Sequence, residues 1–73
     1  MQRQINGAAI RAIREPLGIP QGELAKRAGI SPSHMNKIEK GVEIPKLETA
    51  VRIARALGVV LDAIAPVIEP VQS

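Results

Sequence analysis

The sequence predicts an all-α fold, a compact bundle of five short helices, and two observations lead to this prediction. First, 45% of the 73 residues are apolar, and these are Ile, Ala, Val, Leu and Met without a single Phe, Tyr or Trp. Second, Gly and Pro divide the chain into short segments in which apolar residues recur at spacings of three and four, the period of an amphipathic helix. A chain of this length forms one domain with one small core. We expect this domain to span residues 1–65, followed by a tail at 66–73.

The first helix is expected over about residues 6–17. Ile10, Ile13 and Leu17 are spaced three and four apart, which places them on one helical face. Asn6 is a favourable N-cap because its side chain can accept a hydrogen bond from a free backbone amide of the first turn.

The second and third helices are expected over residues 21–28 and 32–40, joined by the turn Gly29-Ile30-Ser31. Glycine suits the left-handed conformation that ends a helix, and Ser31-Pro32 is a strong start signal. A three-residue turn crosses the two helices at a steep angle. The positions that then face the core are Leu24, Ala25, Ala28, Ile30, Met35 and Ile38, with Ala25 at the closest approach of the two backbones. The outer side of the third helix is left with Ser33, Asn36, Lys37 and Lys40.

The fourth helix begins near Pro45, ends at Gly58 and carries the clearest apolar stripe: Leu47, Ala50, Val51, Ala54 and Leu57. A short fifth helix is expected over residues 60–65, with Leu61 and Ile64 facing inward, until Pro66 stops it. The tail at 66–73 contains two prolines, so it is not helical, and it is unusually apolar for a terminus.

Basic residues are concentrated in the first part of the chain. Residues 1–41 hold seven Lys/Arg against three acidic residues, a net charge of +4, whereas residues 42–73 have a net charge of −1. A basic half favours a polyanionic partner, since each phosphate that is neutralised releases condensed counterions. The alternative is ordinary solubility charge, and a total of +3 does not decide between the two.

Several classes of function are disfavoured by composition. The absence of cysteine excludes a disulfide framework and a thiol nucleophile, and His34 is the only histidine, so we expect no metal site and no cofactor. No acid–base pair or phosphate loop is recognisable, so an enzyme is not expected. No apolar run approaches the ~20 residues that span a bilayer, and the N-terminus does not resemble a signal peptide. We therefore expect a soluble protein of the cytoplasm.

Motif residues of one known family occur in order along the chain: Ile10-Arg11 and Arg14-Glu15, the run QGELAKRAGIS at 21–31, Met35, IEKG at 38–41, Pro45, LET at 47–49, Ile53-Ala54, ALGV at 56–59 and Leu61-Asp62. On these residues the chain resembles the lambda-repressor-like (Cro/cI, XRE-type) helix-turn-helix DNA-binding domains. The resemblance covers about residues 6–65, and the ordered set is specific although each motif alone is weak.

The resemblance implies that the third helix enters the major groove of double-stranded DNA while the second lies across the backbone. It assigns base reading to Pro32, Ser33, Asn36 and Lys37, with Pro32 offering only apolar contact. It assigns backbone contact to Gln21, Lys40, Lys46 and, indirectly through a pair with Glu39, Arg14. The structural positions of the motif are Ala25, Gly29, Ile30, Met35 and Ile38.

Two positions depart from the family pattern. Pro20 and Val60 stand where the second and fifth helices would have a capping side chain, and each loss costs about 1 kcal/mol of stability. Neither position lies on the predicted recognition face, so the departures concern stability.

The function implied is that of a repressor or Cro-like transcriptional regulator acting at a pseudo-palindromic operator as a homodimer, in a bacterial nucleoid or a phage-infected host. The resemblance does not distinguish phage repressors from plasmid or restriction-system controllers. We expect the apolar tail to form the dimer contact, the alternative being that it folds back on its own domain. A protein-interaction module on the same fold, such as an antitoxin or antirepressor, is the competing function, and the tail favours it.

Overall fold

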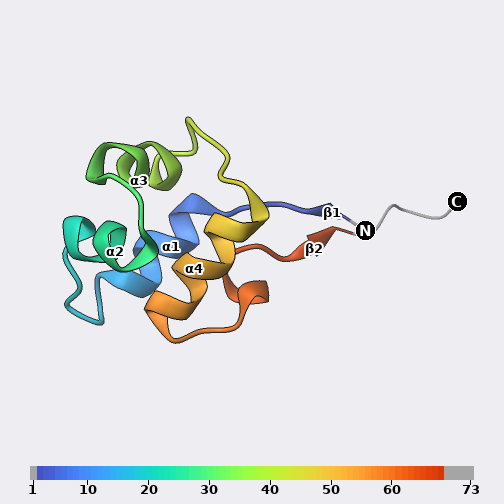
Figure 1. The fold of residues 1–73 in the computed structure, drawn as a ribbon. Coiled ribbons are helices and arrows are strands. Elements are labelled where there is room, and N and C mark those ends of the chain that lie inside the picture. The colour runs from blue at the N-terminus through green and yellow to red at the C-terminus, as the bar shows by residue number, and fades with distance from the viewer. Residues whose placement is uncertain (1, 69–73) are drawn as a thin grey trace, which may run out of the picture.

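Four α-helices lie within residues 2–68 of the computed structural model, which is the part of the chain that it describes. They are α1 (Gly7–Arg14), α2 (Gln21–Ala28), α3 (Pro32–Glu39) and α4 (Leu47–Leu57). A one-turn 3-10 helix, η1 (Leu61–Ala63), follows α4, and a two-residue strand lies near each end of this range, β1 (Gln2–Arg3) and β2 (Val67–Ile68). The helical bundle predicted from the sequence is therefore present, with a small strand pair in addition (Figure 1).

Helices α1 and α3 begin at the capping residues that the sequence indicates. The side chains of Asn6 and Ser31 accept hydrogen bonds from backbone amides three residues further on, at 3.1 and 3.0 Å. Gly29 ends α2 in the left-handed conformation, with φ of +74°. Pro20 and Val60 provide no side-chain cap to α2 and η1, as predicted.

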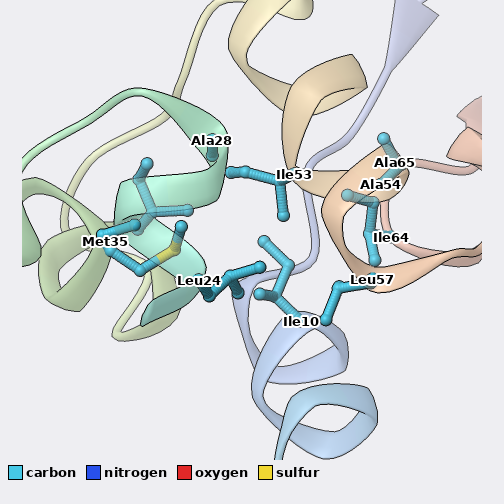
Figure 2. Packing of buried hydrophobic residues seen from close by; sticks show 11 residues of the cluster. Ile10, Leu24, Ala28, Met35, Ile53, Ala54, Leu57, Ile64 and Ala65 are labelled. Atoms are coloured by element: carbon cyan, nitrogen blue, oxygen red, sulfur yellow. The ribbon is translucent and has the colours of Figure 1, made fainter. Parts of the chain in front are cut away.

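The core lies where α2 meets the other helices. α2 packs against both α3 and α4, and α1 packs against α3. Figure 2 shows aliphatic side chains from every helix converging on this centre. The cluster of buried apolar residues consists of Ile10, Leu24, Ala25, Ala28, Met35, Ile38, Ile53, Ala54, Leu57, Ile64 and Ala65.

Two apolar positions that the sequence placed in the core are exposed. Leu17 is 54% exposed because α1 ends at Arg14 and the chain turns tightly there, with the Leu17 amide donating to the Arg14 carbonyl at 3.2 Å. Leu47 is 57% exposed because it begins α4, ahead of the part that packs on α2. The buried face of α4 is centred instead on Ile53, which the predicted stripe left out.

The predicted fifth helix is wrong in type and length. Only one turn of 3-10 helix forms at Leu61–Ala63, because Val60 supplies no cap and Pro66 prevents the chain from continuing. Ile64 is fully buried as predicted, whereas Leu61 is only partly buried. Residue 64 thus anchors this segment to the core without a helix behind it.

The beginning of the tail runs back along the start of the chain. β1 and β2 pair in antiparallel fashion, with Gln2 opposite Ile68 and Arg3 opposite Val67. The pairing continues toward the bundle through a hydrogen bond of 3.2 Å from the Gln4 amide to the Pro66 carbonyl. In Figure 1 the strands extend from the end of the molecule opposite to α2 and α3. The rest of the predicted tail, residues 69–73, lies outside the described residues.

None of the helices within residues 2–68 combines the length and apolar character needed to cross a membrane.

α1 approaches the end of α3 closely at Gly7. This residue is buried, and a Cβ built on it would overlap the carbonyl oxygen of Ile38 and lie 2.9 Å from that of Glu39. Both obstacles are backbone atoms, so neither can move aside without shifting a helix. Glycine at position 7 therefore sets the distance between α1 and α3.

We predict that Gly7→Ala lowers the free energy of unfolding by about 1–3 kcal/mol through overpacking. Gly22→Ala is the matched control, because Gly22 is exposed on α2 with no heavy atom within 4 Å of a built Cβ. The control should raise the free energy of unfolding by roughly 0.5–1 kcal/mol. Urea unfolding followed by circular dichroism measures both, and equal effects of the two substitutions would contradict the close approach.

Candidate nucleic-acid interface

The turn between α2 and α3 brings the two helices into contact at a small residue. Gly29 adopts the left-handed conformation, and the Ile30 amide then donates to the Ala25 carbonyl at 2.9 Å. Ala25 and Met35 are completely buried, Ile38 is 1% exposed, and Ile30 is half-buried against the core. These contacts fix one face of α3 inside the bundle, so the opposite face is turned outward.

The outward face of α3 is polar. Pro32, Ser33 and Lys37 are exposed, and Asn36 is half-buried between α3 and the start of α2. Lys40, the C-cap of α3, is also exposed. The helix and its C-cap together thus carry a hydroxyl, an amide and two ammonium groups, which are the groups that reach base edges and phosphates in a duplex.

A buried ion pair holds α3 against α1. Arg14 donates from Nε to Glu39 Oε2 at 2.8 Å and from Nη2 to Glu39 Oε1 at 3.0 Å, which is a bidentate contact. Nη1 of Arg14 donates to the Ile19 carbonyl at 2.9 Å. Only 10% of the Arg14 side chain and 3% of the Glu39 side chain are exposed. The pair that the resemblance implied between the first and third helices is thus present.

α2 joins the same network through its first residue. Gln21 Nε2 donates to Glu39 Oε1 at 3.1 Å and lies 3.4 Å from Asn36 Oδ1. The hydrogen bonds that Arg14 donates to Glu39, together with the negative charge of that carboxylate, raise the pKa of Arg14 above its ordinary value. The guanidinium therefore stays charged at every accessible pH, and the network links three helices behind the polar face of α3.

A polar hollow of about 320 Å³ opens next to this network. Its lining residues are Arg11, Arg14, Gln21, Asn36, Glu39 and Lys40. Of the predicted site residues, Arg14, Gln21, Asn36 and Lys40 line this hollow. Gln21 contacts Asn36 directly, and Gln21 and Arg14 both donate to Glu39. Lys46 is not part of this hollow and lies in the connection between α3 and α4, where it is exposed.

Sequence reasoning missed one contact of α3. His34 Nε2 on α3 lies 3.0 Å from Glu43 Oε2 in the α3–α4 connection. The amides of Val42 and Glu43 both donate to the Lys37 carbonyl, at 2.9 and 3.3 Å. His34 and Glu43 are nine positions apart, and Glu43 lies beyond the end of α3, so helical periodicity gave no signal for this pair. The connection is therefore fastened to α3.

No group of three or more His, Cys, Asp or Glu side chains gathers into a candidate metal site within residues 2–68.

In sequence the chain is similar to known helix-turn-helix proteins. Residues 10–64 match the helix-turn-helix family. An uncharacterized HTH-type transcriptional regulator of Methanothermobacter thermautotrophicus is 49% identical over 49 residues, which cover 67% of this chain and 71% of the relative. The regulator YazB of Bacillus subtilis is 36% identical over 90% of this chain and 96% of its own length. Other relatives are longer: the chain spans 24% of the regulator y4dL of Sinorhizobium fredii.

Solved structures have the same fold. The P22 c2 repressor in complex with a synthetic operator has a TM-score of 0.74 and 32% identity, covering 81% of this chain and 89% of the repressor chain. The restriction-modification controller protein C.AhdI of Aeromonas hydrophila has a TM-score of 0.76 and 26% identity, covering 78% of this chain and 86% of its own.

We predict that Arg14→Leu and Glu39→Leu each lower the free energy of unfolding by about 3–5 kcal/mol, because each leaves one buried charge without its partner. The double variant should lose much less free energy of unfolding than the two single variants lose together, since no unpaired charge remains. Urea unfolding of the four proteins of this cycle measures the coupling.

The control for this cycle is Arg52→Leu, which removes an exposed pair with Glu48 at 2.7 Å. This substitution should lower the free energy of unfolding by less than about 1 kcal/mol. If the double variant loses as much free energy of unfolding as the Arg14 and Glu39 variants lose together, the buried pair does not act as a unit.

Proposed function

This chain belongs to the lambda-repressor-like (Cro/cI, XRE-type) helix-turn-helix family of DNA-binding regulators, and we propose that it recognises a specific operator in double-stranded DNA through α3. One observation carries the proposal: α3 turns a polar face outward while the buried network of Arg14, Glu39 and Gln21 holds that helix from behind. By occupying the operator, the protein blocks or redirects RNA polymerase in the cytoplasm of its host.

Base reading is assigned to the exposed side of α3. Ser33 and Lys37 lie one helical turn apart and are exposed, so both reach the same strip of the major groove. Asn36 reads a base edge with its amide nitrogen, because its Oδ1 is turned toward Gln21. Pro32, at the first position of the helix, contributes apolar contact with a thymine methyl group.

Backbone contacts are assigned to groups around this face. Gln21 begins α2, and both protons of its Nε2 are donated to Asn36 and Glu39, so it contacts a phosphate through its backbone amide, which has no partner within the helix. Lys40 lines the polar hollow and is positioned for a phosphate on the rim of the groove. Lys46 reaches a phosphate from the α3–α4 connection. Arg14 acts indirectly, because all three of its guanidinium nitrogens already donate to Glu39 and Ile19.

Two copies act on one operator. A single α3 reads only a short sequence, and a two-fold dimer places two such helices on half-sites about 34–36 Å apart, one turn of the duplex. The operator is therefore pseudo-palindromic.

Selection of preferred sites from random duplexes tests the function. We expect enrichment of one short sequence, present twice at a spacing of one helical turn. The logarithm of the affinity for that duplex should fall linearly with the logarithm of the salt concentration. Failure to enrich any sequence would overturn the proposal and favour a protein partner.

We predict that Lys37→Ala reduces the preference for the selected site over random duplex by about 10- to 100-fold, through loss of a base contact. Arg55→Ala is the matched control, since it removes the same charge from an exposed position on α4. The control should weaken binding to both duplexes equally and leave the preference for the selected site unchanged. Fluorescence anisotropy with labelled duplexes measures both ratios, and identical behaviour of the two variants would remove Lys37 from the reading face.

A further inference from the structure

His34 is the only histidine in the sequence, which also contains no cysteine. Histidine is the side chain that ordinarily changes its charge between pH 5 and 8, whereas lysine and arginine keep theirs throughout that range. His34 lies on α3 directly after Ser33 and one helical turn before Lys37, the two exposed residues to which base reading is assigned. A change in the charge of this ring therefore takes place at the border of the proposed DNA interface.

The ring of His34 meets a carboxylate from the connection between α3 and α4. Its Nε2 lies 3.0 Å from Glu43 Oε2, and 35% of the His34 side chain and 47% of the Glu43 side chain are exposed, so water reaches both groups. A neutral ring donates one hydrogen bond here and leaves the carboxylate negative. A protonated ring donates the same bond and cancels that charge. The pair thus has a total charge of −1 or of zero, depending on pH.

The backbone holds Glu43 next to α3 whichever charge the ring has. The amides of Val42 and Glu43 donate to the Lys37 carbonyl at 2.9 and 3.3 Å, and Pro45, two residues further on, is buried. The carboxylate therefore stays close to the C-terminal end of α3. A negative charge in this place opposes the approach of DNA phosphates.

The other charged groups on and around α3 leave the neutralisation of Glu43 to His34. The remaining ion pairs are Arg11 with Glu15 and Arg14 with Glu39 from α1, Arg27 with Glu23 on α2, and Arg52 with Glu48 on α4. Among the described residues, the lysines of α2, α3 and the α3–α4 connection have no carboxylate partner, namely Lys26, Lys37, Lys40 and Lys46. Their charge stays constant between pH 6 and 8.

We propose that protonation of His34 neutralises Glu43 and thereby strengthens the binding of double-stranded DNA, so that the affinity rises as the pH falls from 8 to 6. This inference rests on the proposed function. Cancelling one negative charge this close to phosphates should raise the affinity about 3- to 10-fold. By linkage, bound DNA favours the protonated ring by the same factor.

Fluorescence anisotropy with a selected duplex at pH 6 and pH 8, at constant ionic strength, tests this dependence. Wild type should bind about 3- to 10-fold more tightly at pH 6. His34→Gln keeps a hydrogen-bond donor for Glu43 but cannot gain a proton, so its affinity should be the same at both pH values.

Glu43→Gln tests the role of the carboxylate. It leaves no negative charge to be neutralised, so this variant should bind at pH 8 at least as tightly as wild type binds at pH 6. Glu48→Gln is the matched control, because it also removes an exposed carboxylate from an ion pair, with Arg52 on α4. The control should keep the wild-type ratio of the affinities at the two pH values.

A wild-type affinity that is equal at pH 6 and pH 8 overturns the proposal while leaving the proposed function intact. A pH dependence that survives His34→Gln, or a Glu43→Gln variant that binds no more tightly than wild type at pH 8, also overturns it. If no duplex binds at either pH, the proposed function has failed, and NMR titration of the free protein decides about the pair. A Glu43 carboxylate carbon that shifts together with the ring of His34 supports the coupling even then, and independent transitions overturn it.

Discussion

The buried pair between Arg14 and Glu39 is the interaction on which the rest of this structure depends. Removing both charges from water is costly, and only a bidentate geometry with every remaining donor satisfied compensates for it. Here Nη1 of Arg14 donates to the Ile19 carbonyl, and Glu39 accepts a further hydrogen bond from Gln21. No buried side-chain nitrogen or oxygen in the described residues lacks a partner. The pair therefore fixes α1, α2 and α3 relative to one another. Packing of small aliphatic side chains alone would define their relative orientation less specifically.

That constraint acts on α3 together with a steric one. Gly7 allows the start of α1 to approach the carbonyl groups of Ile38 and Glu39 at the end of α3. Glu39 is thus fixed twice, through its carboxylate by Arg14 and through its backbone by α1. A helix of eight residues such as α3 has little hydrogen bonding of its own and would not be stable alone. Its orientation comes from these two contacts and from the buried side chains of Met35 and Ile38.

Much of this structure could be predicted from interactions between residues that are close together in the sequence. Features that depend on distant residues could not. Asn6, Ser31 and Gly29 act within one helical turn, so the capped helix ends could be placed from the sequence. Whether Leu17, Leu47 or Ile53 is buried depends instead on where neighbouring helices end and cross, which periodicity does not report. The pairing of β1 with β2 and the contact of His34 with Glu43 join residues that are distant along the chain. Of the candidate site, the family pattern indicated the Arg14–Glu39 pair, but gave no sign of the tight fit at Gly7.

In the proposed function, the size of α3 sets the length of DNA sequence that one copy can recognise. Eight residues rise about 12 Å, which corresponds to roughly four base pairs at 3.4 Å each. A sequence of four base pairs recurs about once in 250 by chance, far too often to mark one operator among the competing sites of a genome. Reading two half-sites together reduces that frequency to roughly one in 65,000. In the proposed function, pairing of two copies therefore supplies the specificity that one short α3 lacks, and the spacing of the pair is as much a part of recognition as the side chains on α3.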